Sequence, residues 1–122
     1  MTQRTIVAIA EDEYLIASAL EYELVEAGFD VVTFPTGDAA VQWLSAGGQP
    51  HVLLTDIRMP GAHDGWALAH RAREIWPNLP VIYVSGDSGA SWTERGVPNS
   101  KMLPKPIDLA DLSAALRDQL AL

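Results

Sequence analysis

Apolar residues along the chain fall into five short runs, each only a few residues long and bounded by polar or turn-forming residues. Such runs are too short for helices of their own, and they are typical of strands buried on both faces of a sheet. We therefore predict five strands. They are Thr5–Ala10, Val31–Phe34, Val52 to Asp56, Val81–Val84 and Lys101–Leu103.

Helical spacing of apolar residues appears between these runs. Over Tyr14–Ala27, the apolar residues Ile16, Leu20 and Leu24 recur on one stripe, and Gly28 is a natural stop. Three further helices begin at residues suited to N-capping: Thr36, Asp64 and Asp108. The second of these helices should end at Ile75 before Pro77.

Two more helical expectations concern the C-terminal third. Leu109, Leu112, Leu116 and Leu120 should face inward on the last helix. Only a short helix, near Trp92–Arg95, is expected in the Gly- and Ser-rich stretch Gly86–Pro98.

Strand and helix alternate five times, without a repeat or a linker. This order predicts an α/β fold with a parallel sheet, helices on both faces and right-handed crossovers, all in one domain over residues 1–122.

Composition narrows the function classes. The chain has 122 residues, no cysteine and a formal net charge of −8. Thiol catalysis, disulfides and Cys-based zinc sites are excluded, and so acidic a domain has no basic patch for nucleic acid. No apolar run approaches the length of a membrane span, and no signal peptide is visible, so we expect a cytoplasmic protein that binds neither nucleic acid nor membrane.

Polar residues with chemical potential follow the predicted strands. Glu11 and Asp12 follow the first, Asp56 ends the third, Ser85 follows the fourth and Lys105 follows the fifth. The carboxyl ends of parallel strands share one edge of the sheet, where ligands bind. Three carboxylates there would either take up a proton or bind a cation such as Mg²⁺. Considered without the other residues, Asp56 could equally cap a turn or a helix. Close to the other acids, Ser85 and Lys105, its carboxylate could also act as a nucleophile toward phosphorus.

This set of motifs resembles the receiver domain of response regulators in two-component signalling. The resemblance covers essentially the whole chain, in the right order and spacing. Its motifs are Glu11–Asp12, Asp56 with Met59-Pro60-Gly61, Asp64–Gly65, Ser85–Gly86 and Lys105–Pro106. It implies a flavodoxin-like, doubly wound (βα)5 fold with strand order 2-1-3-4-5.

The resemblance also implies roles for the acidic residues. Asp56 would accept a phosphoryl group from a histidine kinase or a histidine phosphotransfer protein. Asp12, Asp56 and the backbone carbonyl of Arg58 would ligate Mg²⁺, and Glu11 would act mainly through water. Such a domain catalyses only its own phosphorylation and dephosphorylation, so we do not class it as an enzyme.

The remaining implied roles belong to the fourth and fifth strands. Lys105 would pair with the phosphoryl oxygens, and the peptide bond before Pro106 would be cis. Ser85 would move to hydrogen-bond the phosphate and relay the change to the surface around the fourth helix and the fifth strand. The family often has an aromatic residue three positions before the lysine; here that residue is Met102, and Tyr83 is a candidate substitute.

Several features of the sequence match other classes of protein. Gly86-Asp87-Ser88-Gly89 matches a serine-protease signature, but those enzymes are larger and all-β, and no histidine is suitably placed. A flavodoxin-like cofactor binder would need a phosphate-cradling loop where Glu11-Asp12-Glu13 stands. A small Mg²⁺-dependent phosphatase and a phosphate-independent pseudo-receiver stay open.

The sequence says less about the downstream partner of the domain than about its acidic site. A protein target downstream and a dimer formed on phosphorylation are both compatible with the resemblance. The start at Met1 favours a stand-alone receiver over a fragment of a larger regulator or hybrid kinase.

Overall fold

Five parallel strands form a single sheet in the order β2-β1-β3-β4-β5, as predicted. The structure is a computed structural model that describes residues 4–87 and 89–121. The strands are β1 (Ile6–Ala10), β2 (Asp30–Phe34), β3 (Val52–Asp56), β4 (Val81–Ser85) and β5 (Lys101–Pro104). Ser88, the serine of the protease-like tetrapeptide, lies outside the described residues.

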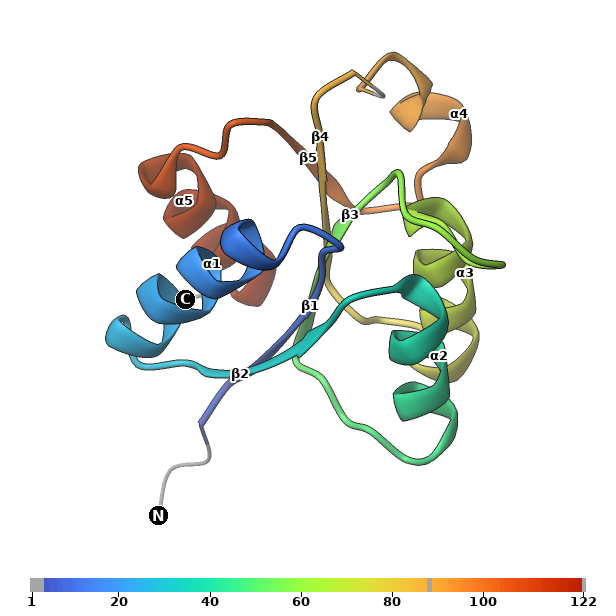
Figure 1. The fold of residues 1–122 in the computed structure, drawn as a ribbon, viewed down its shortest axis with the longest axis horizontal. Coiled ribbons are helices and arrows are strands. Elements are labelled where there is room, and N and C mark those ends of the chain that lie inside the picture. Colours follow the sequence, from blue (N-terminus) through green and yellow to red (C-terminus); the bar gives the residue numbers. More distant parts are fainter. Residues whose placement is uncertain (1–3, 88, 122) are drawn as a thin grey trace.

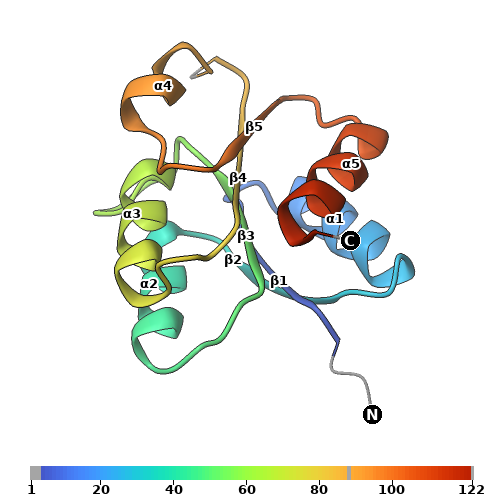
Figure 2. The same cartoon turned by 180° about the vertical axis from the view of Figure 1, so that it is seen from behind.

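Helices cover both faces of this sheet (Figures 1 and 2). On one face lie α1 (Tyr14–Glu26) and α5 (Leu109–Leu120). On the other lie α2 (Gly37–Ser45), α3 (Gly65–Ile75) and the short α4 (Trp92–Arg95), which a 3-10 turn at Gly89–Ser91 precedes. The α/β doubly wound prediction is therefore confirmed.

The sheet separates two hydrophobic clusters. Every residue of β3 and β4 is buried. Alternation along a strand sends successive side chains to opposite faces, so Tyr83 packs with the α2–α3 cluster and Val84 with the α1–α5 cluster. The buried sheet gives the strand ends a rigid base.

Three predicted N-caps are confirmed. The Thr36 hydroxyl accepts a hydrogen bond from the Ala39 N–H at 3.0 Å, and the Asp64 carboxylate accepts one from the Ala67 N–H at 2.9 Å. Asp108 caps α5 in the same way. These local bonds fix where the helices leave the sheet edge.

Two details concern α4 and α5. The fourth helix has four residues, as the sequence predicts. The prediction for Leu109 is wrong: this first residue of α5 is 45% exposed, because it lies at the rim of a groove beside α1. Within residues 4–87 and 89–121, no helix has the length and apolar character that crossing a bilayer requires.

Candidate functional site

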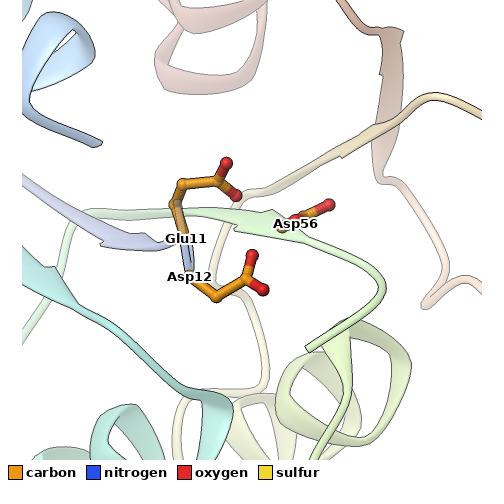
Figure 3. Close-up of side chains that lie close together, drawn as sticks. All are labelled: Glu11, Asp12 and Asp56. Carbon is orange, nitrogen blue, oxygen red and sulfur yellow. The ribbon is translucent and has the colours of Figure 1, made fainter. Parts of the chain in front are cut away.

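The acidic residues predicted to gather at the strand ends lie together. Glu11 directly follows β1, and Asp56 is the last residue of β3, the neighbouring strand. Glu11, Asp12 and Asp56 each offer a carboxylate oxygen, and these oxygens all lie within 4.8 Å of one another (Figure 3). Glu11 and Asp56 are buried, whereas Asp12 is exposed, so the cluster opens to solvent on the Asp12 side.

Lys105 bridges two of these carboxylates. Its ammonium nitrogen Nζ lies 3.0 Å from Glu11 Oε1 and 3.1 Å from Asp56 Oδ2. The Lys105 backbone N–H donates to the Ser85 carbonyl at 3.0 Å, which ties the loop after β5 to the end of β4. The Lys105–Pro106 peptide bond is cis, as the resemblance implies. The Lys105–Glu11 contact was not anticipated from the sequence.

The proton affinities of this cluster depend on burial and on these contacts. Burial, followed by the neighbouring Asp56, raises the pKa of Glu11 from 4.5 to about 7, against the opposing effect of Lys105. Burial alone would lower the pKa of Lys105, but its hydrogen bonds to Glu11 and Asp56 outweigh that effect and raise it. The site thus favours binding of additional positive charge, either a proton or a cation.

Asp56 itself is held by backbone groups. Its Oδ1 accepts a hydrogen bond from the Ile57 N–H at 2.8 Å, and the Gly65 N–H donates to the Ile57 carbonyl at 2.7 Å. A Cβ atom on Gly65 would collide with the Asp56 carbonyl oxygen. Glycine at this position therefore lets the start of α3 approach the end of β3.

The loop between β3 and α3 is anchored by Asp38, which the sequence reasoning missed. Its carboxylate accepts from the Ala62 N–H at 3.1 Å and the His63 N–H at 2.8 Å, and it contacts His63 Nδ1 at 2.8 Å. The His63 side chain, followed by the Ala62 N–H, lowers the pKa of Asp38. No spacing rule identifies this anchor, because it joins the first turn of α2 to a loop 24 residues later.

Ser85 and Arg58 lie where the chain leaves β4 and β3, the strand that carries Asp56. Ser85 is buried at the end of β4, and its hydroxyl accepts from the Asp87 N–H at 3.2 Å. Arg58 follows Asp56 by two residues, and its exposed guanidinium pairs with Asp87 at 3.1 Å. The two loops that flank Asp56 are thereby joined at the surface.

The donor set fits Mg²⁺. The cluster offers three carboxylates and no histidine or cysteine, and hard oxygen ligands suit this ion. Asp12 and Asp56, with the Arg58 carbonyl, are the groups that would hold it. Lys105 already compensates Glu11 and one oxygen of Asp56 in this structure.

Comparison with known proteins decides the family. The sequence profile of the response regulator receiver domain matches residues 7–117. The chain belongs to this family. Receiver domains are the phosphoacceptors of two-component signalling, and the similarity to them supports that role for this chain.

Similar proteins come in two sizes. The response regulator receiver protein CpdR of Brucella abortus is 36% identical over 109 residues, which are 87% of this chain and 88% of that protein. The DNA-binding transcriptional regulator NtrC of Klebsiella pneumoniae is 38% identical over 121 residues, which are 96% of this chain but 25% of NtrC. The chain thus spans about a quarter of the length of that relative.

Solved structures agree with the fold. A response regulator receiver protein from Sinorhizobium medicae superposes with a TM-score of 0.93 at 36% identity, covering 98% of this chain and 96% of the other. The receiver domain of the hybrid histidine kinase CckA gives a TM-score of 0.79 at 29% identity, covering 94% and 98%.

Proposed function

We propose that Asp56 is the phosphoacceptor. The observation that carries this assignment is the position of its Oδ2, 3.1 Å from the Lys105 ammonium and within the carboxylate cluster. A carboxylate can attack phosphorus to form an acyl phosphate. In that step an Asp56 oxygen forms the new P–O bond while the bond from phosphorus to the donor's imidazole nitrogen breaks.

The neighbouring groups have complementary tasks. Phosphoryl transfer depends mainly on positioning and on neutralising charge at the equatorial oxygens. Mg²⁺, when bound, would supply part of that neutralisation. Lys105 supplies a fixed ammonium, and Ser85, buried at the end of the adjacent strand, supplies a hydroxyl donor once its rotamer turns toward the phosphate.

We also propose where the phosphoryl donor docks. A groove of about 600 Å³ lies between α1 and the β5–α5 loop and has Lys105 in its wall. Leu15 of α1 and Leu109 of α5 line this groove, and they are 81% and 45% exposed. Exposed apolar surface beside a reactive group is typical of a protein interface. A histidine kinase or histidine phosphotransfer protein is the donor that this face would receive.

The related proteins differ in whether further domains accompany the receiver. NtrC and CckA carry their receivers within larger proteins, whereas CpdR is close to this chain in length. We propose that phosphorylation changes protein–protein contacts, with a downstream protein or a second copy as the partner. The alternative, a phosphate-independent interaction module, would not need the Asp56–Lys105 pair.

The test uses a small phosphodonor. Incubated with Mg²⁺ and acetyl phosphate, the wild-type chain should gain the mass of one phosphoryl group, and Asp56→Asn or a chelator should abolish the gain. Lack of any gain in the wild type, or an equal gain in Asp56→Asn, rejects the assignment.

A further inference from the structure

The helix α4 buries little surface of its own. All four of its residues are described and none is fully buried, although Trp92 packs against the core cluster that contains Tyr83. Isolated helices of this length are unstable in water. The Trp92 packing and a few polar and ring contacts must therefore hold α4 against the rest of the molecule.

The central contact comes from Tyr83 in β4. Its side chain is fully buried, and its hydroxyl accepts a hydrogen bond from the Val97 N–H at 3.0 Å, two residues after α4 ends. The Tyr83 ring also packs on Trp66 of α3, with ring centroids 4.8 Å apart and an interplanar angle of 54°. One residue thus joins the central sheet, α3 and the segment after α4.

A second set of contacts closes around the same segment. The Trp92 indole N–H donates to the Ser100 hydroxyl at 2.9 Å, and that hydroxyl donates to the Val97 carbonyl at 2.7 Å. A Cβ on Gly96 would collide with the Trp92 ring, so glycine there permits the ring's position. Val97 is consequently fixed at its N–H by Tyr83 and at its carbonyl by Ser100.

The C-terminal end of α4 is also tied to α3. The Arg95 guanidinium lies over the Trp66 ring, 5.6 Å from its centroid, and the Arg95 carbonyl lies 2.9 Å from His70 Nε2. These are surface contacts that break at low cost compared with buried ones. The buried Tyr83–Val97 bond is the part of this network anchored in the sheet.

We propose that Tyr83 is a positioning residue that fixes α4 to the strand carrying Ser85. Side-chain alternation along β4 puts Tyr83 and Ser85 on the same face, two residues apart. The inference rests on the proposed function and on the relay from Ser85 that the resemblance implies: the Tyr83 hydroxyl is the contact through which such a relay reaches the segment after α4.

This arrangement differs from an aromatic residue that changes rotamer at the surface. Met102 pairs with Tyr83 in the β4–β5 register and packs against the same cluster, but its side chain carries no hydroxyl. Tyr83 is enclosed by the core and has no solvent-facing alternative without leaving it. We therefore expect Tyr83 to keep its rotamer within the core and to carry a displacement of β4 to the segment after α4 through its hydroxyl.

Hydrogen exchange tests the anchor directly. In Tyr83→Phe, the Val97 amide loses its acceptor and should exchange roughly tenfold faster than in the wild type. The matched control is Tyr22→Phe, because Tyr22 is 64% exposed, and it should leave Val97 exchange unchanged. An unchanged Val97 rate in Tyr83→Phe overturns the proposal.

A second variant separates anchoring from general loosening. Ser100→Ala should release the Trp92 indole N–H, while Val97 exchange rises less than in Tyr83→Phe because its acceptor remains. Equal increases of Val97 exchange in the two variants would also overturn the proposal, since Tyr83 would then have no special part.

Coupling to the acceptor site is read from the Trp92 indole resonance on addition of Mg²⁺ and beryllofluoride. We expect a shift of this resonance in the wild type that persists in Tyr22→Phe and falls by half or more in Tyr83→Phe, which should still take up phosphate from acetyl phosphate. An undiminished shift in Tyr83→Phe contradicts the coupling. Failure of the wild type to take up phosphate would instead refute the proposed function, and the exchange experiment would still decide the anchor.

Discussion

At the scale of single residues, Lys105 is the group on which the acidic site depends electrostatically. It is the ammonium shared by Glu11 and Asp56, both of which are buried. Removing one partner of a buried charge cluster leaves the others without compensation. The site should therefore be sensitive to this lysine even before any phosphate arrives.

Replacing Lys105 with methionine keeps most of its apolar length and removes its charge. We expect the free energy of unfolding in metal-free buffer to fall by about 1–3 kcal/mol, with added Mg²⁺ recovering part of the loss. Chemical denaturation with and without Mg²⁺ measures both effects. The control is Lys101→Met, which breaks an exposed pair with Asp118 and should cost less than about 1 kcal/mol. Equal losses in the two variants would contradict this role.

Glu11 makes stability depend on pH. Its pKa is about 7 in the folded chain, against an ordinary value of 4.5. Between these values the folded state binds more protons than the unfolded state, so stability must fall as pH rises from about 4.5 to about 7. One pKa unit corresponds to about 1.4 kcal/mol, so the interval from 4.5 to about 7 allows at most about 3.5 kcal/mol. Solvent on the exposed Asp12 side of the cluster screens the charges and lowers this figure, so we expect the contribution of Glu11 to stability to fall by roughly 1–3 kcal/mol in metal-free buffer.

The comparison variant for this pH effect is Glu11→Gln, which has nearly the same shape and does not titrate. The difference in unfolding free energy between wild type and variant should change across this pH range and should flatten when Mg²⁺ competes with the proton. Parallel pH profiles for the two proteins would show that Glu11 is not the group responsible.

The reactive residues could be predicted because each directly follows an apolar run. Asp56 and Glu11 need only a parallel sheet to become neighbours, and the structure places them so. The Asp38 anchor and the Lys105–Glu11 contact could not be predicted. They depend on the paths of a loop and a long side chain between distant segments, and sequence spacing does not encode those paths.

At the scale of elements, the approach of α3 to β3 positions the acceptor. Two opposing effects meet at Gly65: alanine usually favours a helix by about 1 kcal/mol over glycine, but its Cβ would collide with the Asp56 carbonyl. We expect the collision to win, so that Gly65→Ala loses about 1–3 kcal/mol of stability and is phosphorylated more slowly by acetyl phosphate.

Gly86, in the loop after β4, provides the control for that substitution. A Cβ on Gly86 meets nothing within 4 Å, so Gly86→Ala should change stability by less than about 0.5 kcal/mol. A Gly65→Ala protein as stable as the wild type, with an unchanged rate of phosphorylation, would show that α3 can move without disturbing Asp56.

The starts of helices could be predicted where a capping residue lies next to the helix in the sequence. Thr36, Asp64 and Asp108 cap helices with bonds to residues two or three positions away, and their type and place indicate this. The brevity of α4 follows from the Gly- and Ser-rich stretch around it. Its attachment through Tyr83 and Trp66 does not, because these contacts join elements that are separate in sequence.

At the scale of the whole molecule, strand order and helix sides place the groove between α1 and the β5–α5 loop next to the Lys105–Asp56 pair. The apolar exposed face of α1 and the β5–α5 loop meet there only because α1 and α5 cover the same side of the sheet (Figure 1). Alternation of strands and helices predicts the class of fold, but the surface shared by the first and last helices depends on the complete topology.

Leu15→Asp tests whether this face receives a protein donor. Leu15 is 81% exposed, so the substitution should barely affect folding, yet a charge there would be desolvated on docking. Transfer from a phosphorylated histidine kinase or phosphotransfer protein should slow about tenfold or more, whereas acetyl phosphate should act at the wild-type rate. The control is Gln42→Asp, at an exposed position of α2 on the other face of the sheet, which should leave transfer from both donors unchanged. Equal slowing with both donors would place the defect at the acceptor site instead.

The most direct measurement is chemical mapping of the phosphorylated residue. After treatment with acetyl phosphate and Mg²⁺, borohydride reduction converts an aspartyl phosphate to homoserine, which peptide mass spectrometry locates. The account predicts homoserine at position 56 and no modification without Mg²⁺. Homoserine at another aspartate, or none under any condition, would contradict it.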